Sequence, residues 1–206
     1  AMLGNIVRGE TRKQIARDPF FAKSEDVYLY VRRRIILGRD GNGTILKVSS
    51  LAEEFDASSS SVLDALRLLE ADGCGSMLGS DSFIVPGYNV IHMVSIVGRR
   101  IEIEAGAALK FIADDSTFDA AIAGLKERHE SMMQVASRII AEKGTSNYES
   151  LLSTFVELDI DFHLALLEFS GQQQLLPELQ RLVTQVLVGT QTMAIDARSS
   201  EVLSEH

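Results

Sequence analysis

The segment from residue 49 to Gly73 constrains the fold most, because it holds two helix starts separated by a tight turn. Ser50, with Glu53 three residues later, predicts a capping box that opens a short helix. Ser58 then predicts the cap of a longer helix, whose apolar residues recur at helical spacing until Gly73 ends it. Two helices joined by a tight turn predict a helix-turn-helix.

The sequence on either side of this segment predicts the rest of a winged helix. Ser24 can cap an earlier amphipathic helix that stops at Gly38, and residues 45–48 can form a small strand. Residues 76–78 and 83–85 flank a turn made of Gly, Ser and Asp, which predicts a short hairpin. In a winged helix the third helix enters the major groove of DNA, and the hairpin, or wing, contacts the backbone or the minor groove.

The second half of the chain shows helical periods and no strand signal. The dipeptide Pro86-Gly87 is the natural linker between the halves. Helical spacing then extends over four long stretches, at about residues 91–113, 117–142, 148–169 and 173–193. We therefore expect a mostly α chain with an N-terminal arm (1–23), a winged-helix domain (24–88) and an all-α antiparallel helical bundle (89–206).

Charge limits how the chain can meet nucleic acid. The net charge is -9, whereas phosphate binding relies on Lys and Arg, so the charge argues against a protein that simply coats nucleic acid. Residues 1–88 carry 11 Lys and Arg against 12 Asp and Glu, and residues 89–206 carry 9 against 17. Any contact with DNA must come from a local patch or from the arm, whose cations are Arg8, Arg12, Lys13 and Arg17.

Composition also bears on compartment and metal chemistry. Cys74 is the only cysteine, so the sequence offers neither an internal disulfide nor a Cys cluster for zinc, which fits a reducing compartment. No stretch resembles a signal peptide, and none approaches roughly 18 uninterrupted apolar residues. We expect a soluble, cytoplasmic protein in which His and carboxylate side chains would bind any metal.

A pattern of scaffold residues runs through the helix-turn-helix: Leu51-Ala52, Ser58, Val62, Asp64, Ala65-Leu66, Leu69-Glu70 and Gly73. This pattern resembles that of the GntR family of transcription regulators. Taken with the wing, the resemblance covers roughly residues 26–86. It implies a domain that binds double-stranded operator DNA.

The positions at which this family contacts DNA differ here, because the resemblance places Ser59 and Leu63 where the family has arginines. Arginine is the commonest reader of guanine, so its loss weakens the contact. Serine hydroxyls and free amides at a helix start can still bind phosphate, although these serines can equally serve only as cap and solvated surface. The expected DNA contacts are Lys47, Ser59, Ser60, Ser61 and Arg67, with Gly79 and Ser82 in the wing.

Asp159 and His163 carry the least usual chemistry of the second half. They lie within the inward stripe that helical spacing predicts for this segment, which comprises Phe155, Leu158, Phe162 and Leu166. A carboxylate and an imidazole four residues apart lie one above the other, so they can bind one divalent cation, either zinc, nickel, manganese or iron. The alternative is an ordinary hydrogen bond between the two side chains within the core.

Two motifs accompany this pair. Arg100 precedes a glutamate and two alanines, and Phe162 comes directly before His163. These motifs resemble the FCD ligand-binding domain that follows many FadR-type GntR heads. The resemblance implies a divalent metal bound by Asp159, His163 and two later histidines, with His206 as the third ligand and the fourth beyond the end of this sequence.

The same resemblance implies a small organic acid as effector, bound at the metal. Arg100 can pair with the carboxylate of that acid, because its planar guanidinium suits a bidentate contact. The alternative is a surface ion pair with Glu104 or Glu102.

Three function classes follow. The leading one is an effector-responsive DNA-binding regulator, expected to act as a repressor and as a homodimer because one short helix alone reads too few base pairs. The second is a metal and organic-acid binding protein with a degenerate DNA-binding head. The third, a metallohydrolase, lacks a clear general base beside the metal ligands, so we expect no enzyme activity.

Overall fold

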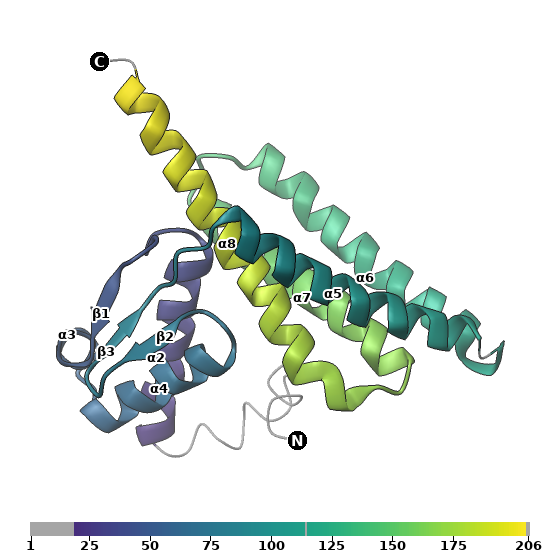
Figure 1. Ribbon diagram of the computed structural model, residues 1–206, viewed down its shortest axis with the longest axis horizontal. Coiled ribbons are helices and arrows are strands. Elements are labelled where there is room, and N and C mark those ends of the chain that lie inside the picture. Colours follow the sequence, from purple (N-terminus) through teal and green to yellow (C-terminus); the bar gives the residue numbers. More distant parts are fainter. Residues whose placement is uncertain (1–18, 114, 205–206) are drawn as a thin grey trace. The chain divides into compact units, whose positions relative to one another are not determined.

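The computed structural model describes residues 19–113 and 115–204, and the side chains of residues 23–113 and 118–191. The chain divides into two compact units. We call the unit that contains the chain up to Tyr88 the head, and the unit formed by Asn89–Leu187 the helical unit; residues from Val188 onward group with the head. Figure 1 shows the helices and strands of the head in purple and blue, and the helical unit from teal to yellow-green.

The head is the predicted winged helix-turn-helix. Its described elements in chain order are α2 Pro19–Ile36, β1 Ile45–Lys47, α3 Val48–Glu54, α4 Ser59–Ala71, β2 Ser76–Leu78 and β3 Ser82–Ile84. β3 lies in the middle of an antiparallel sheet, where Ile84 is opposite both Ile45 of β1 and Ser76 of β2. The hairpin β2–β3 is therefore the wing (Figure 1).

Apolar stripes on α2 and α4 form the core of the head. The two helices pack against each other because each has buried residues at helical spacing. These are Val27, Val31 and Ile35 on α2 and Val62, Leu66 and Leu69 on α4, all fully buried. Phe83 of β3 is also fully buried. A Cβ added at Gly75 would lie 2.4 Å from the Phe83 ring, so position 75 requires glycine.

Two predicted helix starts were wrong. Ser24 does not cap the first helix but lies within α2, which already begins at Pro19. Proline is favoured in a first helical turn, which accounts for this earlier start. Ser50 opens no capping box, since α3 follows directly from β1 with Lys47 as the N-cap residue and no side-chain cap. The amide of Val48 bonds the Asp81 carbonyl at 2.8 Å instead, so strand pairing sets this start.

The turn between α3 and α4 is held by contacts from α2. Asp56 has a φ of 46°, a conformation that non-glycine residues rarely adopt. Lys23 of α2 donates to its carboxylate at 3.0 Å and to the Phe55 carbonyl at 3.3 Å. Ser58 caps α4 as predicted, accepting from the amide of Ser61 at 3.1 Å. The turn therefore fixes where α4 begins.

The four predicted long helices are present, although the last α-helix begins at Leu176 and continues past the predicted residue 193. The elements of the helical unit are α5 Val90–Ile112, α6 Asp115–Ala141, α7 Tyr148–Phe169, the short 3-10 helix η2 Gln173–Leu175, and the first part of α8 Leu176–Ser204. α7 packs against both α5 and α6. No helix in the described part of the chain is long and apolar enough to cross a membrane.

The stripe predicted on α7 was displaced. The buried core of the helical unit contains Ile160, Leu164 and Leu167 of α7, together with Ile103 and Ala107 of α5 and Leu179 and Val183 of α8. The side chains of Phe155, Leu158 and Phe162 are only partly buried, and Leu166 lies at the edge of this core. The helix has apolar residues almost all round, so periodicity alone could not choose the face that meets α5 and α8.

Candidate nucleic-acid interface and buried polar cluster

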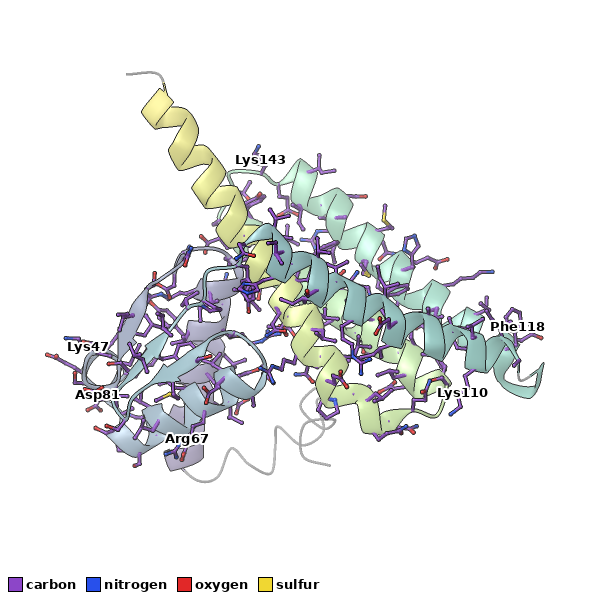
Figure 2. The ribbon with its side chains drawn as sticks, in the orientation of Figure 1. Lys47, Arg67, Asp81, Lys110, Phe118 and Lys143 are labelled. Atoms are coloured by element: carbon purple, nitrogen blue, oxygen red, sulfur yellow. The ribbon has the colours of Figure 1, made fainter. Side chains whose placement is uncertain are left out.

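Lys47, Ser59, Ser60, Arg67 and Gly79 lie exposed on the head. Lys47 stands where β1 passes into α3, and Figure 2 shows it at the same edge of the head as Asp81, with Arg67 on α4. Gly79 adopts a φ of 70° in the wing turn, which favours glycine. These exposed groups are the part of the predicted DNA contact set that solvent can reach.

Ser61 and Ser82 do not belong to that surface. Ser61 is 2% exposed, because it lies on the buried side of α4. Its hydroxyl lies 2.9 Å from that of Ser58. Ser82 is 9% exposed in the central strand, and its hydroxyl donates to Asp81 at 3.1 Å. Their side chains stabilise the helix start and the wing, so we remove both from the expected DNA contacts.

The charge around α4 is balanced by neighbouring carboxylates. Arg67 is the one cation of α4, and it pairs with Asp64 at 3.4 Å while both side chains stay exposed. Lys47 is exposed and forms no ion pair within the described part of the chain. The arm cations lie outside the described residues. Lys47 is therefore the described cation best placed to neutralise a phosphate.

A cluster of four ionisable side chains joins α5 to α7 in the helical unit. Oε1 of Glu104 lies 2.9 Å from Nδ1 of His163 and 3.3 Å from Nε of Arg100. Nε2 of His163 lies 3.7 Å from Oδ1 of Asp159. The four side chains are 15% to 21% exposed. We call these residues the polar cluster.

Local helix geometry places the polar cluster. Arg100 and Glu104 are one turn apart on α5, and Asp159 and His163 are one turn apart on α7. Each pair borders buried residues of its own helix, so the packing of α5 on α7 brings the two pairs together. The sequence did not show that Glu104 would contact His163, because that contact depends on how two distant helices pair.

His163 is held in its charged form. Burial lowers the pKa of His163, but the close carboxylates of Asp159 and Glu104 together outweigh burial and raise this pKa to about 9. The polar cluster then contains two cations and two anions, so its charge is balanced. An imidazolium has no free nitrogen lone pair, so a metal ion could bind His163 only by displacing its proton.

Three atoms of the polar cluster lack a hydrogen bond of normal geometry: Arg100 Nε, Glu104 Oε1 and His163 Nδ1. They lie at ion-pair distances, but the angles do not align a proton with an acceptor. Buried polar atoms are nearly always hydrogen bonded, so this shortage marks a place where a ligand could improve the bonding.

The expected metal site is incomplete within the described residues. Asp159 and His163 face each other as predicted, yet no three His, Cys, Asp or Glu side chains of the described residues form a group that could hold a metal ion. His206 lies outside the described residues. Arg100 does pair with Glu104, although this pair is largely buried instead of lying on the surface, while Glu102 pairs with Arg99 at 3.3 Å.

The sequence of the head matches a known family. The family model described as "Bacterial regulatory proteins, gntR family" matches residues 23–76. These residues form a GntR-type helix-turn-helix domain. The matched range contains α3, α4 and the turn that Lys23 holds. No curated protein matches the chain.

Three solved structures are similar to the chain to different degrees. McbR/YncC of E. coli is similar to the chain with a TM-score of 0.58 at 19% identity, over 85% of this chain and 76% of that one. Lar, described as controlling expression of the Listeria monocytogenes agr system, has a TM-score of 0.43 at 18% identity over 80% and 72%. Streptococcus agalactiae GntR has a TM-score of 0.27 at 16% identity over 88% and 98%. Only the first similarity supports an argument, and it shows only that the two chains share a fold.

Proposed function

We propose that the chain is a DNA-binding transcription regulator, acting as a homodimer, whose operator binding is controlled by a small carboxylate bound in the polar cluster. One observation carries the proposal: a GntR-type head is followed in the same chain by a helical unit with a buried, incompletely bonded cluster of charged groups. The head supplies the DNA-reading element, and the cluster supplies a place where a small anion can change how α5 and α7 are joined.

DNA binding is supported by the capped, exposed start of α4. Ser58 accepts one amide of the first turn, and Ser59 and Ser60 project from this end of the helix. The remaining amides and the helix dipole favour a phosphate there. Lys47 adds one positive charge at the edge of the same head. This set contacts the DNA backbone more than it reads bases, so we expect modest affinity and strong salt dependence.

The DNA proposal is tested by gel-shift titration at low salt with the gene's own upstream region, using a random duplex for comparison. Lys47→Ala should weaken binding and reduce the salt slope by about one charge. Lys143→Ala is the matched control, because it removes the same charge from an exposed position in the helical unit (Figure 2). Equal affinity for the upstream region and the random duplex would contradict a regulator.

The effector proposal rests on the donors that now face Glu104. The carboxylate of a small acid could accept from Arg100 Nε and His163 Nδ1, replacing Glu104 with better geometry. Displacing Glu104 would loosen the link between α5 and α7. A panel of small mono- and dicarboxylates can be screened by calorimetry. Arg100→Gln should abolish binding, whereas Arg99→Gln should preserve it, because Arg99 pairs with Glu102 and Glu178 on the exposed side.

A divalent metal beside this effector is the finer part of the proposal. Asp159 and His163 would hold it with His206, and the metal would supply open coordination positions for the acid. Metal content of the purified protein, measured for wild type and Asp159→Ala, tests this. Asp161→Ala is the control, because Asp161 lies on the same helix but pairs with Arg128 at 2.9 Å. Equal metal content in wild type and Asp159→Ala would exclude the site.

A second function is favoured by the carboxylates around α4. Asp64 neutralises the only cation of that helix, which suits a metal and organic-acid binding protein whose head no longer binds DNA. Effector binding without any operator binding would select this function.

The direction of control, which we expect to be repression, is tested by a promoter fusion, where loss of the protein should raise transcription.

A further inference from the structure

α4 presents one side to the core of the head and the other side to solvent. Its buried residues are Ser61, Val62, Ala65, Leu66 and Leu69. In the first two turns, the other side carries Ser59, Ser60, Leu63 and Asp64, which are exposed or partly exposed. We call these four residues the outer α4 face. Leu63 is its one apolar member, and nothing in the proposed DNA contacts uses it.

The outer α4 face is the part of the described head that would meet base edges. In a helix-turn-helix the second helix lies in the major groove, and its N-terminal residues contact the bases. α4 is the second helix of the GntR-type helix-turn-helix, and Ser58 caps its start. This step rests on the proposed function of the chain as a DNA-binding regulator.

The polar members of the outer α4 face distinguish bases poorly. Ser59 and Ser60 offer hydroxyl groups, which bond to phosphates or to several different bases. Asp64 pairs with Arg67 at 3.4 Å, and the phosphates on both sides of the groove repel its negative charge. A regulator must nevertheless prefer its operator to other DNA. Leu63 is the remaining side chain of this face that can supply such a preference.

The chemistry of Leu63 selects one base. A leucine side chain has neither a donor nor an acceptor, so a polar base edge placed against it loses water and gains no hydrogen bond. Thymine differs from the other bases because it presents a C5 methyl group in the major groove. Contact between this methyl group and Leu63 removes apolar surface of both from water. We infer that Leu63 is a specificity-determining residue, which contacts the methyl group of a thymine and requires an A·T pair at that position of the operator.

The core of the head positions Leu63. Its neighbours Val62 and Leu66 on α4 are fully buried, so the helix cannot turn about its axis without exposing them. Leu63 itself is partly buried, which restricts its side chain before any DNA is bound. The start of α4 is fixed as well, since Ser58 caps the helix and Lys23 holds the turn before it. Leu63 therefore meets DNA in a preformed position, one turn into α4.

Leu68 is the matched comparison for Leu63. It is a second leucine of α4, and it is 43% exposed. It lies five residues after Leu63, which places it about 140° further round the helix and in the third turn. Because the N-terminal residues of the second helix are those that contact bases, we expect Leu68 to contact none. A substitution at Leu68 therefore controls for the loss of an exposed leucine from the same helix.

Replacement of thymine by uracil tests the methyl contact. Uracil lacks the C5 methyl group but pairs with adenine in the same way, so each thymine of the gene's own upstream region is replaced in turn and the affinity of the full chain is measured. Wild type should lose about fourfold in affinity at each thymine that Leu63 contacts, which corresponds to one buried carbon group. Leu63→Ala should bind the unmodified region more weakly and should show no further loss with uracil.

The control and the contrary results are equally specific. Leu68→Ala should keep the full uracil effect, and alanine preserves the helix in both variants, which circular dichroism checks. Absence of any uracil effect in wild type would overturn the inference. A uracil effect of the same size in Leu63→Ala would also overturn it, because another residue would then contact the methyl group.

Leu63→Arg tests the same contact by a change of preference. Arginine bonds the O6 and N7 atoms of guanine, so selection from a randomised duplex pool should give A·T at this position for wild type and G·C for Leu63→Arg. Leu68→Arg adds the same charge and should strengthen binding without changing the selected base. Identical selected sequences for wild type and Leu63→Arg would reject the inference.

These measurements separate the inference from the proposed function. Wild type that binds the upstream region and a random duplex equally would contradict the regulator itself. Wild type that prefers the upstream region, but binds its uracil-substituted forms as tightly as the unmodified one, would leave the regulator in place and contradict only the role of Leu63.

Discussion

Two polar contacts of the head each join two side chains, whereas the polar cluster of the helical unit brings four ionisable side chains together. In the head, Tyr28 donates to Asp72, and Arg34 pairs with Asp40 at 2.6 Å. In the polar cluster, Glu104 alone faces both Arg100 and His163. The Tyr28–Asp72 hydrogen bond joins α2 to the end of α4, while the Glu104 carboxylate, which faces two cations, can release one of them to a ligand. We therefore expect the polar cluster to exchange a partner for a ligand more readily than the Tyr28–Asp72 contact does.

The largest expected effect is a pH dependence of the stability of the helical unit, which comes from His163 in the polar cluster. His163 has a pKa of about 9 when folded and near 6.5 when unfolded, so its stabilisation is complete below pH 6.5 and is lost as pH rises through 9. In metal-free protein the free energy of unfolding should fall by on the order of 3 kcal/mol over that range. Urea denaturation at both pH values measures it. His163→Gln should remove this fall in the free energy of unfolding with pH. An unchanged fall in the variant would show that His163 in the polar cluster is not its cause.

The next effect concerns the hydrogen bond between Tyr28 and Asp72 in the head. Burial, together with Asp72, raises the pKa of Tyr28, and its hydroxyl links α2 to the end of α4. Tyr28→Phe removes a donor from the buried Asp72 carboxylate and should destabilise the head by about 2 kcal/mol. Hydrogen exchange of the α4 amides measures this. Tyr30→Phe should have almost no effect, because Tyr30 is 40% exposed and packs by its ring on Phe55.

A smaller effect tests whether Glu104 is truly shared. Glu104→Gln removes the negative charge beside Nδ1 and should lower the pKa of His163 by about one unit, or about 1.4 kcal/mol. A proton NMR titration of the imidazole reports this pKa directly. Glu102→Gln should leave it unchanged, because Glu102 is exposed and pairs with Arg99. If both substitutions shift the pKa equally, the effect is one of overall charge.

The smallest effect is expected at the turn of the helix-turn-helix. Asp56→Gly loses an exposed ion pair with Lys23 but gains a residue that adopts the observed φ of 46° without strain. The melting temperature of the head should rise or stay within about 2 °C of wild type. A larger fall, measured by calorimetry, would mean that this exposed pair stabilises the head as strongly as the buried ones do.

Local signals predicted the helices and strands well. Ser58, Gly38 and Gly73 act as predicted, because a cap or a positive φ depends only on residues within one turn. Ser50 failed as a cap because the pairing of β1 with β3, distant in sequence, sets the start of α3. Ser61 failed as a DNA contact for a related reason, since its burial follows from which side of α4 meets the rest of the head.

The amino-acid order alone thus determined a GntR-type winged helix followed by long helices, and it placed Asp159 one turn before His163. Only the packed structure decided that Glu104 contacts this histidine and that one side of α5 stays uncovered. The physical reason is that helix periodicity is a local property, whereas the rotation of one helix against another depends on the fit of all their side chains.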